Sequence, residues 1–145
     1  MKVLIQRVSS AHVEVEGKII GEIDKGLLVF VGIEKRDDRL LANKMVNKIL
    51  SYRVFPDTKG KMNLSVNDIK GEILIVSQFT LAADTNNGTR AGFSTAKSPQ
   101  EAEIIYNHMI EKFELSSAKV EKGIFAANMR VALVNDGPVT FLLKC

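Results

Sequence analysis

Apolar and polar side chains alternate near the start of the chain in the pattern of a half-buried strand. Val13 and Val15 are the apolar positions of this alternation, and the residues between and beside them are polar. A period of two places alternate side chains on opposite faces of a sheet. The following Gly17–Lys18 suits a turn, so we expect a hairpin into a second strand at Ile19–Ile23.

Two short apolar runs, Leu27–Ile33 and Ile73–Val76, have a different pattern. They are rich in β-branched residues, are bounded by glycine or charged residues and contain no alternating polar positions. Such runs are typical of strands that are buried on both faces. We therefore expect both runs to be central strands of a sheet.

Helical spacing of apolar residues predicts two helices. The first begins at a cap formed by Asp37 or Asp38 and ends near Ser51. The second has stronger start signals, because Ser98–Glu101 combines a capping serine, a proline at the first helical position and a glutamate three residues after the cap. The apolar positions are Leu41, Ala42, Met45, Val46, Ile49 and Leu50 in the first helix, and Ala102, Ile105, Tyr106, Met109, Ile110 and Phe113 in the second.

The end of the chain reads as two strands, Met129–Val134 and Val139–Leu143, joined by a tight connection at Asn135–Pro138. About seven strands and two main helices are then expected in all. Because strands and helices do not strictly alternate, the chain is expected to form an α+β domain with mainly antiparallel pairing. A length of 145 residues with 46% hydrophobic residues suits a single domain over residues 1–145.

Composition narrows the setting in which the protein works. No apolar stretch approaches the ~20 residues needed to cross a bilayer, and the first residues lack the pattern of a signal peptide. The one cysteine, Cys145, leaves no intrachain disulfide. We expect a cytoplasmic protein with no membrane partner.

Charge and motifs exclude several classes of function. The net charge of +3 permits an RNA partner but does not require one. Neither a CxxC pair nor a His/Cys cluster is present, and the dinucleotide, P-loop, HExxH and GxSxG motifs are absent. We therefore expect no metal and no cofactor. The two histidines, His12 and His108, are most simply read as solvent-facing residues.

Polar side chains follow the predicted strand at Ile73–Val76. Ser77, Gln78 and Thr80 lie where a rigid strand could direct them into a cleft, with Phe79 among them. Thr80 could be a nucleophile or a positioning hydroxyl. The alternative is that these side chains only satisfy backbone groups at the strand end.

Two further segments are ambiguous when taken alone. Gly137–Pro138 could form a plain hairpin turn, although its proline directly precedes a strand. Asn86–Gly92 has the glycines of a surface loop, in which Arg90 could bind a phosphate or remain an ordinary solvated side chain.

Taken together, these segments resemble the D-aminoacyl-tRNA deacylase family over essentially the whole chain. The matching motifs are Gln6-Arg7-Val8, Gly60-Lys61-Met62-Asn63-Leu64-Ser65, Ser77-Gln78-Phe79-Thr80-Leu81 and Asn135-Asp136-Gly137-Pro138-Val139-Thr140. The resemblance implies barrel-like sheets and removal of D-amino acids from tRNA. One departure is Ala91, which stands where the family more usually has a proline.

The resemblance also implies a homodimer in which a cis Gly137–Pro138 unit of one subunit enters the pocket of the other. There its main-chain carbonyls would reject an L side chain by steric exclusion, without a pocket for any particular D side chain. Because glycine has no side chain to exclude, some hydrolysis of glycyl-tRNA is also implied.

The resemblance assigns roles to individual residues. Arg7 would support the Gly137–Pro138 unit, the N–H groups of Phe79 and Thr80 would hold the ester carbonyl, and Phe125 would stack on the terminal adenine. Cleavage has two readings: attack by Thr80, or activation of water with help from the 2′-hydroxyl of the terminal adenosine. The family favours the second, and no base motif near Thr80 supports the first.

Two other functions remain open on the sequence. The chain could be a binding module for tRNA or protein that hydrolyses nothing, although the intact motifs argue against it. It could also be a small esterase that acts on free acyl esters without an RNA body.

Overall fold

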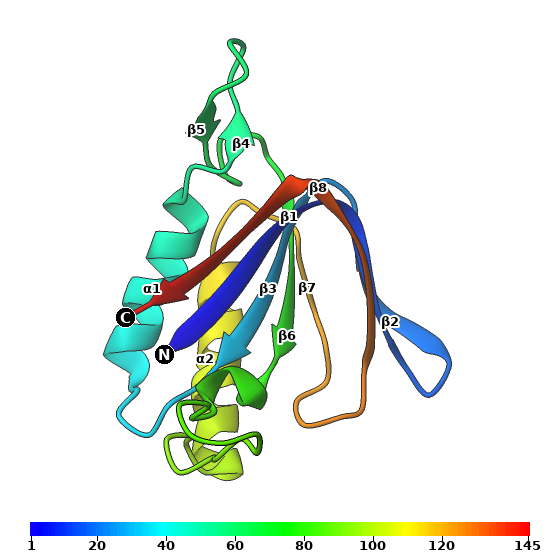
Figure 1. Ribbon diagram of the computed structural model, residues 1–145. Helices are drawn as coiled ribbons and strands as arrows, with labels where there is room; N and C mark the ends of the chain where they lie inside the picture. Colours follow the sequence, from blue (N-terminus) through cyan, green and yellow to red (C-terminus); the bar gives the residue numbers. More distant parts are fainter.

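The computed structural model describes residues 1–145, in which two helices pack beside a large curved sheet (Figure 1). The elements in chain order are β1 (Lys2–Val15), β2 (Lys18–Ile23), β3 (Gly26–Gly32), α1 (Arg39–Ser51), β4 (Phe55–Pro56), β5 (Met62–Leu64), β6 (Glu72–Ser77), the 3₁₀ turn η1 (Phe79–Ala82), α2 (Pro99–Glu114), β7 (Val120–Lys122) and β8 (Arg130–Lys144). Neither helix combines the length and the hydropathy of a membrane-spanning segment.

The main sheet is mixed. Its order is β2-β1-β3-β6-β7, and β8 pairs with the length of β1. The pairs that involve β1 are antiparallel, whereas β3–β6 and β6–β7 are parallel. The short strands β4 and β5 form a separate hairpin. The expected α+β domain with two main helices and barrel-like sheets is confirmed, and the parallel pairs are an addition that local patterns did not predict.

The core lies on both sides of the sheet. A cluster of 23 buried residues fills the space between the two helices and one face, and a cluster of seven fills the fold of β1, β2 and β8 over the other. Six of the seven residues of β3 and the Ile73–Val76 part of β6 are buried, as the apolar runs predicted. Burial on both faces explains why neither strand alternates.

The first helix begins and ends where its pattern predicted. Asp38 is its cap, since the carboxylate accepts a hydrogen bond of 2.8 Å from the N–H of Leu41. Asp37, the other candidate, is buried and binds the α-ammonium of Met1 at 2.6 Å and the N–H of Glu34 at 2.6 Å. Asp38 therefore caps the helix, whereas Asp37 binds the first residue of the chain.

Asp37→Asn should lower the free energy of unfolding by about 3 kcal/mol, because it leaves a buried ammonium with only one of its two carboxylates. The matched control is Asp38→Asn, which removes the same charge at the next position and keeps a good capping residue. Urea unfolding of both variants measures the difference. Equal losses of stability would contradict the buried role of Asp37.

The second helix begins at Pro99 and buries the six residues of its predicted stripe. The position of its predicted cap is right, but the predicted capping hydrogen bond is absent. Ser98 holds the cap position but makes no side-chain bond to the helix backbone; its hydroxyl instead donates to the carboxylate of Glu101 at 2.6 Å. The side chains of the motif therefore pair with each other rather than with the free N–H groups.

The two predicted strands at the end of the chain are one strand, so the expected hairpin is wrong. Both halves of β8 run antiparallel to β1, with Asn135 opposite Val8 and Thr140 opposite Gln6. The residues between them form a bulge in a strand that bends but does not reverse (Figure 1). A glycine and a proline before a strand suit a bulge as well as a turn, and only the pairing with β1 distinguishes them.

Candidate functional site

A hollow of about 470 Å³ lies at the end of β6 and is mostly apolar. Ser77, Gln78 and Phe79 form part of its wall, and Phe125 lies in the wall contributed by the loop between β7 and β8. Its volume is within the range of small-molecule sites. The structure therefore brings together four residues that the sequence placed in two separate segments.

The polar segment after β6 is held by its backbone. The N–H of Gln78 donates to the carbonyl of Val31 at 2.8 Å, and the chain then enters the turn η1. Phe79 and Thr80 begin this turn, so their N–H groups have no partner within it. The Gln78 amide donates to the Thr80 hydroxyl at 2.6 Å. These two N–H groups are thus left without a partner inside the turn, and Thr80 itself is exposed and does not line the hollow.

A buried tyrosine supports Phe125. The rings of Tyr106 and Phe125 lie with their centroids 5.6 Å apart, and the Tyr106 hydroxyl donates to the carbonyl of Ile75 at 3.0 Å. Burial raises the pKa of this hydroxyl well above its usual range. The sequence placed Tyr106 in the apolar stripe of α2, and its helical spacing gave no sign of a supporting role.

No carboxylate or imidazole lines the hollow, and its one charged wall residue is Lys97. Asn128 and Met129 also line it. The sequence did not indicate Lys97, Asn128 or Met129 as site residues, because no local pattern links them to β6.

His108 lies outside the hollow and contacts Asn43 at 2.9 Å. The chain has no cluster of three metal-ligating side chains. The hollow therefore offers hydrogen-bonding groups, an apolar wall and one ionisable side chain, that of Lys97.

The second candidate group surrounds the bulge of β8. Arg7 donates from Nε to the carbonyl of Asp136 at 2.9 Å and from Nη1 to the carbonyl of Val54 at 2.6 Å. Both Gly137 and Pro138 are exposed, and the peptide bond between them is cis. The arginine thus connects the exposed unit to the segment after α1.

Within one chain the two groups are far apart. Arg7 pairs with Leu27 at the start of β3, whereas Ser77 pairs with Val31, four residues further on. This offset is about 13 Å along the strands, and the three strand spacings from β8 to β6 add roughly 14 Å across the sheet. Figure 1 shows the bend of β8 and the turn after β6 at opposite ends of the sheet. The structure therefore does not bring all the expected residues together.

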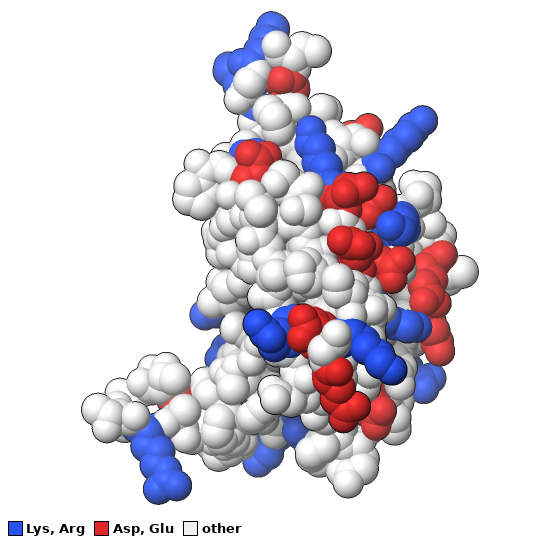
Figure 2. All heavy atoms as spheres, turned by 90° about the vertical axis from the view of Figure 1, so that its right-hand side faces the viewer, with Lys and Arg blue, Asp and Glu red and all other residues white.

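The outer face of β8 exposes apolar side chains. Val134 and Leu142 point outward on the strand and are 58% and 50% exposed. Figure 2 shows the β4–β5 hairpin projecting at the top of this side of the molecule and a broad surface without charged side chains below it. This side therefore carries exposed apolar surface next to the Gly137–Pro138 unit.

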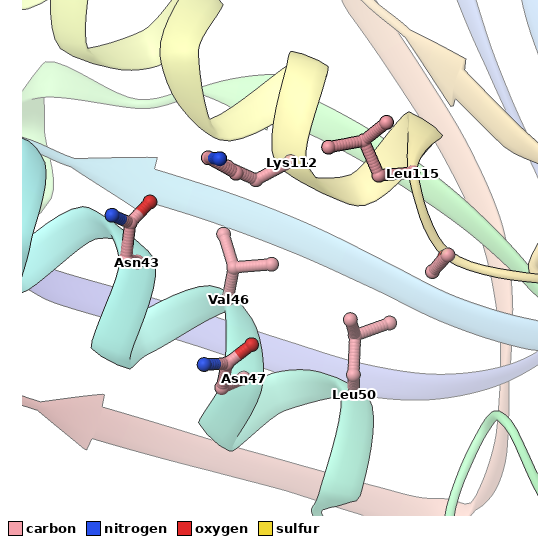
Figure 3. Close-up of a pocket in the computed structure, with 7 residues that line it drawn as sticks. Asn43, Val46, Asn47, Leu50, Lys112 and Leu115 are labelled. Carbon is pink, nitrogen blue, oxygen red and sulfur yellow. The ribbon is translucent and has the colours of Figure 1, made fainter.

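A second hollow lies between α1 and α2, and none of the expected site residues lines it. Its wall includes Val46, Leu50, Leu115 and the amides of Asn43 and Asn47 (Figure 3). Lys112 is its one charged residue. No residue of the predicted site lines this groove, so it is a weaker candidate for the functional site than the hollow at β6.

The Asn86–Gly92 segment is a surface loop, as its glycines predicted. Asp84 and Gly92 exchange two backbone hydrogen bonds at its base, 2.8 and 2.9 Å long. Arg90 and Ala91 are exposed. Phe93, at the end of the loop, packs against Phe79 with 5.0 Å between ring centroids, so the loop reaches the wall of the hollow.

Comparisons with known proteins agree over nearly the full chain. The family described as D-Tyr-tRNA(Tyr) deacylase matches residues 4–144. Proteins named D-aminoacyl-tRNA deacylase are 54% identical over 144 residues in Alcanivorax borkumensis, with 99% of each chain covered, and 52% identical over 145 residues in Pseudomonas paraeruginosa, with 100% of each covered.

Two solved structures have the same fold. One, described as c-Myc DNA Unwinding Element Binding Protein, is 40% identical with a TM-score of 0.95, and the match covers 100% of this chain and 99% of that one. The other, a probable eukaryotic D-amino acid tRNA deacylase, is 16% identical with a TM-score of 0.85 over 98% and 97% of the two chains. The second likeness concerns the fold alone. On the match over residues 4–144 and the identity to full-length relatives, this chain belongs to the D-Tyr-tRNA(Tyr) deacylase family of aminoacyl-tRNA ester hydrolases.

Proposed function

We propose that this chain removes D-amino acids from tRNA in a site completed by a second copy of itself. The observation that carries the proposal is the distance between the hollow and the Gly137–Pro138 unit, which one chain cannot close without breaking its sheet. A second copy could bring its exposed unit to the hollow of the first. The exposed apolar side chains of Val134 and Leu142 on the outer side of β8 support a homodimeric contact there.

In the proposed site the hollow holds the acceptor 3′ end of the aminoacyl-tRNA. Phe125 stacks on the terminal adenine, and its packing against Tyr106 fixes the plane of its ring. The free N–H groups of Phe79 and Thr80 receive the ester carbonyl, where negative charge develops as water adds. Ser77 and Gln78 position this segment.

The Gly137–Pro138 unit of the partner supplies the chiral selection. Its main-chain carbonyls face the α-carbon of the amino acid and leave no room for an L side chain, so the filter excludes L and tolerates many D side chains. Glycyl-tRNA passes the same filter. Arg7 keeps the unit in place through its bond to the carbonyl of Asp136.

Cleavage is assisted by the 2′-hydroxyl of the terminal adenosine, which helps to activate the attacking water. The Thr80 hydroxyl is bonded to an amide, and the wall of the hollow contains no imidazole or carboxylate that could remove its proton. The reaction needs no metal or cofactor. We place it in the cytoplasm, because the reducing conditions there suit a chain with one unpaired cysteine.

Matched D- and L-aminoacyl-tRNA test the proposal directly. We expect hydrolysis of the D form to be faster by at least about 100-fold, or roughly 2.7 kcal/mol of transition-state free energy. Release of labelled amino acid measures both rates. Hydrolysis of neither form would indicate a binding module, and hydrolysis of both would remove the chiral filter. Equal turnover of a free D-amino acid ester would indicate a small esterase.

A further inference from the structure

Three basic residues lie on two segments that border the hollow. Lys97 lies in its wall, and Lys35 and Arg36 follow Ile33, another wall residue, on the neighbouring segment. The two segments are joined by hydrogen bonds from the Lys97 N–H to the Ile33 carbonyl at 3.1 Å and from the Lys97 ammonium to the Lys35 carbonyl at 2.8 Å. We call Lys35, Arg36 and Lys97 the basic rim.

Two carboxylates beside the basic rim, those of Glu34 and Asp37, are bound to another cation. Glu34 and Asp37 both bind the α-ammonium of Met1, at 2.8 and 2.6 Å. Burial raises the pKa of Glu34, but its bonds to that ammonium and to Lys2 lower it by more, so the carboxylate stays ionised and engaged. The three cations of the basic rim make no ion pair of their own.

Lys97 is the one charged residue that lines the hollow. A ligand that pairs with the basic rim must therefore carry negative charge beside the opening of the hollow. A single-stranded RNA end does so with one phosphate for each nucleotide. We propose that the basic rim binds the phosphates of the RNA segment that leads to the terminal adenosine. This inference rests on the proposed function, because it takes the hollow as the site of that adenosine.

The β4–β5 hairpin is the competing surface. It carries Lys59 and Lys61, which are exposed and make no ion pair, but it also carries Asp57. The hairpin projects from the end of the molecule that holds the bend of β8, away from the turn after β6 (Figure 1). Its two lysines therefore provide a matched control with the same change of charge.

The test compares Lys35→Gln/Arg36→Gln with Lys59→Gln/Lys61→Gln. All four positions are exposed, where substitutions seldom change stability by more than about 0.5 kcal/mol. The probe is a fluorescent RNA stem-loop that carries no amino acid and has a single-stranded 3′ tail ending in adenosine. Its affinity for the protein is measured at several salt concentrations.

We expect the rim variant to bind this RNA at least tenfold more weakly than the unchanged protein. The slope of log affinity against log salt should fall by about 1.4, since two contacts to single-stranded phosphates are lost. The hairpin variant should bind as the unchanged protein does.

Unchanged binding by the rim variant, or equal weakening in both variants, would overturn the proposal. The binding experiment is separate from catalysis. If the RNA binds through the rim but D-aminoacyl-tRNA is not hydrolysed, the proposed function fails and the rim inference stands.

Discussion

Gly137→Ala should lower kcat/KM for D-aminoacyl-tRNA by at least about 100-fold, or roughly 2.7 kcal/mol. An added Cβ would lie 2.8 Å from Cγ2 of Val139 and 2.9 Å from Nη2 of Arg7. Arg7 cannot move away cheaply, because two other nitrogens of its side chain are bonded to the carbonyls of Asp136 and Val54. Gly137 also has φ of +133°, which L residues rarely adopt. Steady-state rates with D-, L- and glycyl-tRNA measure the effect.

The matched control for this change is Gly17→Ala. Gly17 also has a positive φ, of +76°, but a Cβ there meets nothing within 4 Å. The control should keep full activity and the full preference for the D form. If Gly137→Ala behaves like the control, Gly137–Pro138 is not the filter.

Mixed dimers show whether the unit acts across subunits. In the proposed homodimer, a Gly137→Ala chain and a Phe125→Ala chain should each be defective in every site of their own dimer. Mixing them creates dimers in which one site has both intact parts, so activity should reappear on mixing. Activity that stays at the level of the separate variants would mean that each subunit uses its own unit.

Replacing the 2′-hydroxyl of the terminal adenosine by hydrogen should slow cleavage by about 1,000-fold or more, equivalent to roughly 4 kcal/mol. The amino acid is attached to the 3′ oxygen in both substrates. Thr80→Ala should reduce the rate by less than about tenfold, because the threonine hydroxyl has only the Gln78 amide as a partner. Single-turnover deacylation under saturating enzyme measures the chemical step.

A binding competition is the control for the deoxy substrate, and it should show affinity close to that of the ribose form. The opposite pattern of rates, with Thr80→Ala inactive and the deoxy substrate active, would rule out RNA assistance. Thr80 would then be the nucleophile despite the absence of a neighbouring base.

Local patterns predicted the elements well. The spacing of Ala102 to Phe113 gave the buried face of α2, and the unbroken apolar run of β3 gave its burial on both faces. In each case the information lies within a few residues, because a helix or a strand repeats its burial along its own length. The start of α1 was recognisable for the same reason, to within the two candidate caps Asp37 and Asp38.

Long-range register was not predictable in this way. The residues after Val134 could turn or bulge, and only pairing with β1, some 130 residues earlier in the chain, makes them a bulge. Asp37 was read as a possible cap because its partner, the α-ammonium of Met1, is 36 positions away. The separation of Ser77 from Gly137 and the place of Lys97 in the hollow likewise depend on how distant segments pair.

Because the hollow and the Gly137–Pro138 unit are far apart within one chain, enzyme activity should depend on the concentration of the protein. In the proposed site no single copy can both hold an ester and check its chirality, so the amount of working enzyme follows the association of two copies. At concentrations below the dissociation constant, halving the number of chains reduces the number of pairs about fourfold by mass action. A cell that makes little of this protein would therefore lose editing capacity faster than it loses the protein.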